Sequence, residues 1–251
     1  MFRKYGLIGI LMIFFVEINF LLKIQPFANW YFPIVWCGYI LTIDALVYKL
    51  RKNSLISNRF NSFLGMILLS ILIWFIFEFV NISFLNWNYS GVSSFGALKY
   101  LFGALSFSTV LPAFFETFEL IRSIHLFDKF RLHKQHKISK NLIHVLIIIG
   151  IACFVLPIVL PKYTFYLIWF AFFFILDPIN YLHEQPSIIK HIKDRELKIP
   201  LALLAAGVMI GFLWEFWNYW AISKWTYDLP SIAGPKIFEM PMFGYIGYFP
   251  F

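Results

Sequence analysis

The chain has 251 residues, of which 61% are hydrophobic, 22% aromatic and only 14% charged. Soluble domains carry about 25% charged residues, so the composition excludes an ordinary water-soluble protein. The formal net charge of +8 fits the cytoplasmic excess of Lys and Arg in membrane proteins, and no nucleic-acid partner is expected. Because lipid offers the backbone no hydrogen bonds, the expected fold class is all-α, a polytopic transmembrane helical bundle.

Apolar runs predict about eight spans in chain order. They cover residues 5–23, 30–50, 62–86, 98–121, 141–160, 164–183 and 200–222, and the eighth begins near residue 238. Most approach the ~20 residues that cross a bilayer. The first run follows Arg3 and Lys4, as in a signal peptide. It contains Glu17 and lacks a small-residue cleavage site, so we expect an uncleaved helix.

The distribution of basic residues predicts the orientation. If successive spans alternate in direction, all but five of the 21 Lys and Arg residues fall on the side of the N-terminus. The exceptions are Lys23, Lys99, Lys162, Lys224 and Lys236. We therefore expect a multi-pass membrane protein with a cytoplasmic N-terminus. Its basic loops are expected to contact anionic inner-leaflet phospholipids.

Polar and aromatic residues recur along the chain and predict an internal duplication. The sequence separation between the two members of a recurring pair is constant except where a predicted loop intervenes. The recurring residues are Trp36, Asp44, Tyr48 and Ser54 with Trp169, Asp177, Tyr181 and Ser187; Glu78, Phe79 and Asn81 with Glu215, Phe216 and Asn218; and Trp87 and Tyr89 with Trp225 and Tyr227. Residues 1–122 and 141–251 are predicted as four-helix repeats, joined by a basic cytoplasmic linker at 123–140. Each repeat has an even number of spans, so the two should be parallel.

The predicted last span is short. Pro250 aligns with Pro112, and the counterpart of Glu116 would fall just beyond Phe251. A helix that begins near residue 238 and ends at Phe251 is too short to cross the ~30 Å hydrocarbon core. The expectation is that the second repeat is incomplete and that its last span is truncated.

Two Glu-x-x-Asn pairs, Glu78/Asn81 and Glu215/Asn218, are the candidate catalytic residues. Spacing i, i+3 places both side chains of a pair on one helix face. Ionisable side chains within a membrane are costly and usually face the protein interior or a water-filled cavity, where a carboxyl group can act as an acid. The alternative is that these side chains join helices by hydrogen bonds without doing chemistry.

The candidate substrate-binding residues are Trp87, Tyr89, Trp225, Tyr227 and Glu239. The two Trp-x-Tyr elements would form the rim of a pocket above the glutamates. Alternatively, they belong to the aromatic belt at the membrane surface. Glu239 would lie near the site, or would cap the N-terminus of the eighth span.

A second repeated set lies on the predicted cytoplasmic side, and we interpret it as structural. A carboxylate near a helix C-terminus is disfavoured by the helix dipole, so Asp44 and Asp177 should have partners, such as the tyrosines four residues later or a basic loop residue. Ser187 is expected to be the N-cap of an interfacial segment at 188–198.

No metal site and no cofactor are expected. His125, His133 and His136 have a spacing compatible with metal binding, but their basic neighbours favour a phosphate contact instead. The nucleotide-binding, Ser/His/Asp and His-Glu-x-x-His motifs are missing from the sequence. Cys37 and Cys153 fall within apolar runs and are expected to be core residues.

The strings SFLGMILLSILIWFIFEFVNISFLNWNY and GFLWEFWNYW, followed by KWTY and KIFEMPMFGYIGYFPF, resemble an uncharacterised family of prokaryotic polytopic membrane proteins. The resemblance covers most of the chain and implies a prokaryotic cytoplasmic membrane, but no activity. A weaker similarity is to the lycopene cyclase domain, in which a Trp-x-Tyr-like element precedes a span with Pro and Glu. That domain's Pro-x-Glu-Glu motif is missing here, so no catalytic residue is transferred.

Three functions are compatible with these features. The favoured hypothesis is an intramembrane enzyme that acts on a membrane lipid or an isoprenoid through buried glutamates, with aromatic rings to stabilise a cation. The second is a secondary transporter or channel with a polar site between the repeats. The third is a structural membrane protein. The shape of the space between the spans at 62–86 and 200–222 distinguishes these three functions. A closed aromatic pocket favours the enzyme, a water path across the bilayer favours the transporter, and a packed interface favours the structural protein.

Overall fold

The computed structural model describes residues 1–92, 95–135, 137–228 and 234–250, and these are mostly helical. Within these ranges, six helical segments are long and apolar enough to cross a membrane: Lys4–Leu21, Tyr31–Arg51, Phe60–Ile82, Leu98–Ser123, Lys140–Val159 and Lys198–Trp220. The predicted all-α class and multi-pass membrane character are therefore supported. Eight spans are not confirmed.

The chain forms two compact units. The first combines Met1–Ile124 with Met209–Asp228 and Lys236–Met240, and the second consists chiefly of His125–Val208. The first segment of this unit ends at Ile124, close to residue 122, the predicted end of the first repeat. The unit also includes residues from the predicted second repeat. The repeat boundaries stay a prediction.

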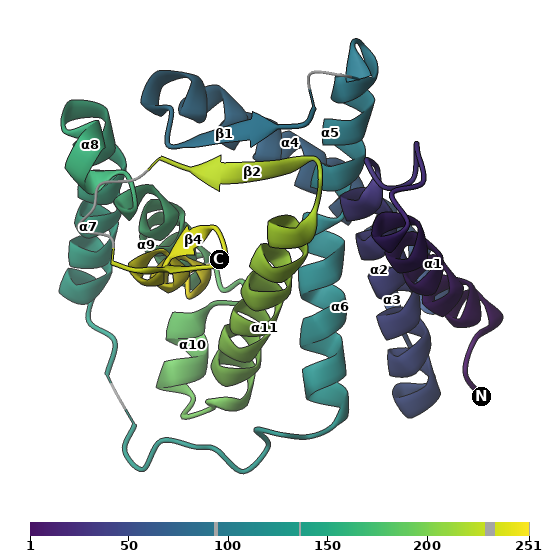
Figure 1. The fold of residues 1–251 in the computed structure, drawn as a ribbon. Helices are drawn as coiled ribbons and strands as arrows, with labels where there is room; N and C mark the ends of the chain where they lie inside the picture. The colour runs from purple at the N-terminus through teal and green to yellow at the C-terminus, as the bar shows by residue number, and fades with distance from the viewer. Residues whose placement is uncertain (93–94, 136, 229–233, 251) are drawn as a thin grey trace. The chain divides into compact units, whose positions relative to one another are not determined.

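The first unit begins with α1 (Lys4–Leu21) and α2 (Tyr31–Arg51), which lie side by side (Figure 1). Two glycines allow their close approach. A Cβ atom on Gly38 would lie 2.8 Å from the carbonyl oxygen of Gly9, and one on Gly9 would lie 2.6 Å from the carbonyl oxygen of Gly38. Small residues at such crossings let helix backbones pack tightly without a hydrophobic driving force.

The short α3 (Leu55–Asn58) and the long α4 (Phe60–Phe84) follow, and then α5 (Leu98–Ser108) and α6 (Val110–Ser123). The span predicted at 98–121 is thus two helices, which meet at Thr109. The hydroxyl group of Ser70 explains the break. It accepts from the N–H of Leu111 at 3.1 Å and donates to the carbonyl of Phe107 at 2.5 Å, so it stands between two groups that would otherwise bond to each other. Pro112 also has no N–H, so it cannot donate a backbone hydrogen bond within the helix.

Aromatic side chains form the core of the first unit. Trp36 is 2% exposed, and its ring centroid lies 4.8 Å from that of Trp217 in an edge-on contact. Trp74 stacks on Trp214 at 5.2 Å. Tyr39 closes the group against Trp36 and Trp217, and its hydroxyl pairs with Thr117. Such edge-on and offset contacts are the favoured arrangements of aromatic pairs.

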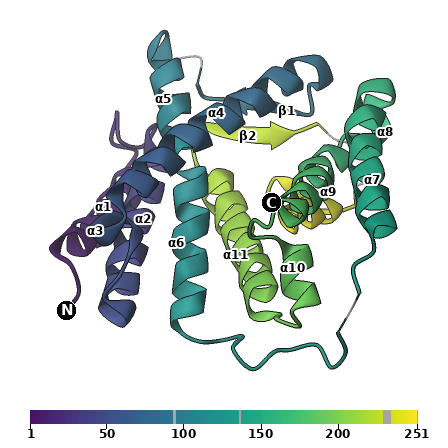
Figure 2. The same cartoon turned by 180° about the vertical axis from the view of Figure 1, so that it is seen from behind.

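The second unit contains α7 (Lys140–Val159), α8 (Pro161–Thr164), α9 (Leu167–Leu182) and α10 (Ile188–Lys193) (Figure 2). It also contains the start of α11 (Lys198–Trp220), which continues into the first unit. The predicted span at 164–183 corresponds to α9. This helix has 16 residues, fewer than the ~20 that cross a bilayer.

The segment predicted as the eighth span contains no spanning helix in its described part. Residues 234–250 form two short paired strands, β3 (Lys236–Ile237) and β4 (Met240–Pro241), and a 3-10 helix, η3 (Met242–Tyr248). Two local features oppose an α-helix here. Phe238 has φ of 58°, in the left-handed region, and Pro241 lacks an N–H. The predicted truncation at Phe251 lies outside the described residues.

The repeated set predicted to be structural caps helices. Ser187 accepts from the N–H of Lys190 as the N-cap of α10, as predicted, and Asp177 accepts from the N–H groups of Ile188 and Ile189. In the first copy, Ser54 caps α3 in the same way.

Asp44 does not pair with Tyr48, which was one of its expected partners. Its carboxylate accepts from the hydroxyls of Tyr5 and Ser54 and from the N–H of Ile56. The ring of Tyr48 instead lies under the Arg3 guanidinium group, 3.8 Å from its centroid. A tyrosine of α1, Tyr5, therefore bonds Asp44 in place of the tyrosine of α2 that the i, i+4 spacing had suggested.

The close contact between α1 and α2 predicts a position-specific effect. A Gly38→Val substitution should lower the free energy of unfolding by about 1–3 kcal/mol, because the new side chain overlaps the α1 backbone. Thermal unfolding of the purified protein in detergent measures the change. Gly65→Val is the matched control, since a Cβ atom there meets nothing within 4 Å. Equal losses in both variants would contradict the prediction.

Candidate functional site

A two-stranded antiparallel ribbon gathers the predicted site residues in the first unit. Strand β1 (Trp87–Ser90) follows α4 and strand β2 (Lys224–Tyr227) follows α11, and the two strands lie side by side (Figure 1). Trp87 is opposite Tyr227, and Tyr89 is opposite Trp225. Residues directly opposite each other, and residues two apart on a strand, share a face. All four aromatic side chains therefore project from one face of the ribbon.

Each asparagine of a Glu-x-x-Asn pair holds one strand to the end of its helix. Asn81 accepts from the N–H of Asn86 at 2.9 Å and that of Trp87 at 3.3 Å, and donates to the Trp87 carbonyl at 2.8 Å. Asn218 accepts from the N–H of Trp225 at 2.9 Å and donates to its carbonyl at 2.8 Å. These bonds lead to the strand backbone rather than to the glutamates of the same Glu-x-x-Asn pairs.

The Trp-x-Tyr side chains donate hydrogen bonds toward the glutamates. Glu78 accepts from the indole N–H of Trp87 at 3.1 Å and from the hydroxyl of Tyr89 at 2.5 Å. Glu215 accepts from the hydroxyl of Tyr227 at 2.8 Å, and that hydroxyl accepts from the indole of Trp225 at 2.8 Å. The Trp87 indole thus bonds the Glu78 carboxylate directly, whereas the Trp225 indole is linked to Glu215 through the hydroxyl of Tyr227.

The two glutamates differ in how deeply they are buried. Glu215 and Asn218 are 0% exposed, whereas Glu78 is half-buried. Because the four donors project from one ribbon face, both glutamates lie beneath that face. The structure thus brings together both Glu-x-x-Asn elements and both Trp-x-Tyr elements. The catalytic and substrate-binding roles assigned to them stay predictions.

Glu239 does not cap a helix, because it lies between β3 and β4. Its carboxylate accepts from the ammonium group of Lys224 at 2.6 Å, and this group also donates to the carbonyl of Tyr219 at 3.3 Å. Lys224 was not among the predicted site residues. Its position directly before the second Trp-x-Tyr element was the available signal, but nothing in the local sequence pointed to Glu239 as its partner.

The Tyr89 hydroxyl is more secluded than its ring. The residue is 43% exposed overall, but the hydroxyl lies against Glu78. Desolvation of the hydroxyl and the negative charge of Glu78 raise the pKa of Tyr89 well above its ordinary value. Tyr89 therefore remains a hydrogen-bond donor to Glu78 throughout the physiological pH range.

The histidines give no sign of a metal centre in the part of the chain that the structure describes. No group of three or more His, Cys, Asp or Glu side chains with suitable geometry occurs there. His125 pairs with Asp128 through Nδ1 and Oδ2 at 2.6 Å. His136 lies outside the described residues.

Comparisons with protein-family models, with curated proteins and with solved structures find no match for this chain. The resemblances based on the Glu-x-x-Asn and Trp-x-Tyr strings are therefore neither supported nor contradicted.

The asparagine bonds predict a structural defect when an amide is removed. Asn218→Ala should destabilise the protein by about 1 kcal/mol for each partly buried Trp225 backbone group left unpaired. The melting temperature in detergent provides the measurement. Asn88→Ala is the control, because Asn88 is exposed at the centre of β1. A melting temperature of Asn218→Ala equal to that of the control would show that the amide does not hold the strand.

Tyr89 predicts a loss of stability at alkaline pH. Its pKa is raised in the folded state, so the unfolded chain loses this proton at a lower pH than the folded chain. The stabilisation is complete below the ordinary tyrosine pKa of about 10 and decreases as the pH rises toward the folded-state value. Chemical unfolding from pH 8 to pH 11 should show a smaller pH dependence for Tyr89→Phe than for the unchanged protein. Identical pH profiles would contradict the assignment.

Proposed function

We propose that this protein is an intramembrane acid–base enzyme acting on a lipid or isoprenoid substrate, with Glu78 and Glu215 as the reacting pair. One observation carries the proposal. Two glutamates from distant parts of the sequence lie beneath one ribbon face, held by the same kinds of donor but at different depths of burial. Two carboxyl groups in contrasting environments are the usual basis for separate acid and base roles.

The proposal includes an internal duplication with parallel repeats. The support is that the same asparagine-to-tryptophan backbone bonds follow both helices, and that Trp87 and Tyr89 pair with Tyr227 and Trp225 in a register symmetric about Asn88 and Thr226. A local two-fold axis through this pair would relate the copies. Both helices end at the ribbon, as parallel rather than inverted copies require.

The chemistry follows from the difference in burial. Glu215, with no exposed surface, is the proton donor, because a neutral carboxyl group is tolerated where a charged one is costly. Protonation of a substrate carbon–carbon double bond leaves a carbocation. Glu78 then removes a proton from a neighbouring carbon, and the electron pair of that C–H bond forms a new double bond. The product is an isomer of the substrate, and transfer of a proton from Glu78 back to Glu215 resets the pair.

The aromatic residues suit a cationic intermediate. Trp225 lies edge-on to Trp214 at 6.3 Å and to Phe32 at 5.1 Å. Aromatic faces stabilise cations by about 0.5–2 kcal/mol each. We place the N-terminus in the cytoplasm and the glutamate pair in the outer half of the membrane, on the basis of the basic-residue distribution.

A structural role is the second candidate. The side chains of Asn81 and Asn218 favour a structural role, because each amide donates to and accepts from the backbone of the ribbon. In that case, the glutamates would anchor the ribbon through Tyr89 and Tyr227 without reacting. Substituting glutamine separates the two candidates, because its carbonyl oxygen still accepts from tyrosine but its amide is not an acid.

The test is lipid analysis of cells that express the unchanged protein, Glu215→Gln or Glu78→Gln at equal levels. We expect a lipid or isoprenoid product that depends on the unchanged protein and falls by about 10²–10⁴-fold in each variant, the usual contribution of general acid–base catalysis. Glu184→Gln, at an exposed carboxylate, is the control. Undiminished product formation by Glu215→Gln would exclude the proposed mechanism.

A further inference from the structure

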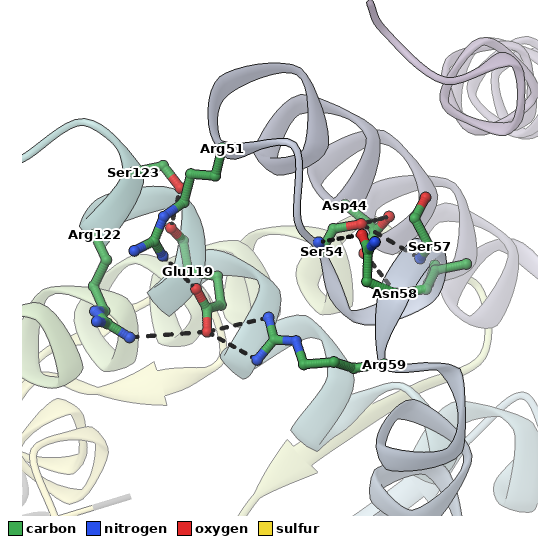
Figure 3. Close-up of polar contacts among 10 residues, drawn as sticks. Asp44, Arg51, Ser54, Ser57, Asn58, Arg59, Glu119, Arg122 and Ser123 are labelled. Atoms are coloured by element: carbon green, nitrogen blue, oxygen red, sulfur yellow. Dashed lines mark hydrogen bonds and ion pairs between the residues drawn. The ribbon is translucent and has the colours of Figure 1, made fainter.

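Three arginines from three helix ends in the first unit converge on one carboxylate. Arg51 is the last residue of α2, Arg59 directly precedes α4, and Arg122 lies in the last turn of α6. Glu119 of α6 accepts from Arg51 at 2.7 Å and from Arg59 at 3.4 Å, and lies 3.9 Å from Arg122 (Figure 3). We call these four residues the arginine cluster.

The arginine cluster has more positive charge and more donors than Glu119 satisfies. Three guanidinium groups and one carboxylate leave a net charge of +2. Each guanidinium group has five N–H donors, and the distance of 3.9 Å from Arg122 to Glu119 is too long for a hydrogen bond. The Nε atom of Arg59 is buried and has no hydrogen-bond partner in the described part of the chain. The three guanidinium groups together therefore keep donors that Glu119 does not use.

The arginine side chains are accessible, whereas their carboxylate is not. Their exposed fractions are 33% for Arg51, 40% for Arg59 and 36% for Arg122, compared with 12% for Glu119. The carboxylate therefore holds the guanidinium groups from the protein side and leaves their outer edges open. An incoming anion would contact the arginines without displacing Glu119.

Further cations surround the N-terminal end of the chain. The nearby ammonium group of Lys52 lowers the pKa of the Met1 amino group, with smaller contributions from Arg3 and Lys49. These positive groups lie close to one another. They include Lys52, next to Arg51 in the sequence, so they extend the positive potential around the end of α2.

The arginine cluster also lies where apolar surface ends. Leu50 and Phe60, next to Arg51 and Arg59, are 47% and 51% exposed, and the guanidinium group of Arg122 lies 5.4 Å from the centroid of the Phe118 ring. Long basic side chains at the ends of apolar helices typically extend toward the headgroup layer. The anion that is most concentrated at this level of a membrane is the phosphate group of an anionic phospholipid.

We propose that the arginine cluster is a binding site for the phosphate group of an anionic phospholipid headgroup, with Arg59 and Arg122 donating to its non-bridging oxygens. The inference is independent of the acid–base chemistry beneath the ribbon. It differs from a general attraction of basic loops to lipid, because it specifies one phosphate position and one competing carboxylate.

Substitutions with opposite effects test the site. Arg122→Gln should weaken binding of an anionic lipid by roughly fivefold, the contribution typical of one basic residue at an anionic surface. Arg122 makes no hydrogen bond to Glu119, so this change spares the bonds between helices. Glu119→Gln should strengthen binding by a similar factor, because it removes the competing negative charge. Lys99→Gln, an exposed charge change on α5, is the control and should have no effect.

The measurement is titration calorimetry of the purified full chain in a neutral detergent. The probes are dihexanoyl phosphatidylglycerol, dihexanoyl phosphatidylcholine and inorganic phosphate. Tight binding of the phosphatidylglycerol alone, weakened by Arg122→Gln and strengthened by Glu119→Gln, supports the site. Equal binding of the phosphatidylcholine, or binding of inorganic phosphate as tight as that of the anionic lipid, overturns it. Weakening by Glu119→Gln would show instead that the cluster only ties helices together.

Discussion

The backbone that leaves a helix must find new hydrogen-bond partners, and the ribbon depends on partners that the same helix supplies. The last carbonyl groups of a helix and the first N–H groups beyond it have no intrahelical partner, and lipid supplies none. Asn81 bonds the backbone of Asn86 and Trp87, and Asn218 bonds the backbone of Trp225, in the two segments that become β1 and β2. With the backbone fixed in this way, the Trp-x-Tyr side chains are directed at the glutamates, and the strands can pair in register.

The grouping of the candidate site residues around one ribbon was partly predictable because the same residue pattern recurs in the sequence, while their roles stay predictions. Glu78, Asn81, Glu215 and Asn218 stand out once the two Glu-x-x-Asn segments are compared, and the structure brings both segments to one ribbon. The roles of the amides were not predictable, because an asparagine on a helix face reveals nothing about the backbone that will turn past it. The ribbon was missed because a short Trp-x-Tyr element at a membrane surface fits an aromatic belt equally well.

The fold departs from the predicted spans where distant residues or local backbone geometry determine the outcome. The break at Thr109 requires the hydroxyl of Ser70, which lies in another helix and leaves no mark in the sequence of 98–121. Tyr5, one of the partners of Asp44, likewise comes from another helix. Hydropathy responds to apolar character and not to backbone angles, so it assigned a span to a segment in which Phe238 has a left-handed conformation.

The ribbon also constrains how the protein is made. Ser90 pairs with Lys224, so a ribosome adding about 5–20 residues per second needs on the order of ten seconds to deliver the second strand after the first. During that interval β1 is an open edge, and open edges invite pairing with the wrong chain. Asn81 is only six residues from Trp87 and can fold the first strand back onto its own helix as soon as both are synthesised. The local amide thus prepares a template on which the late strand completes the pairing.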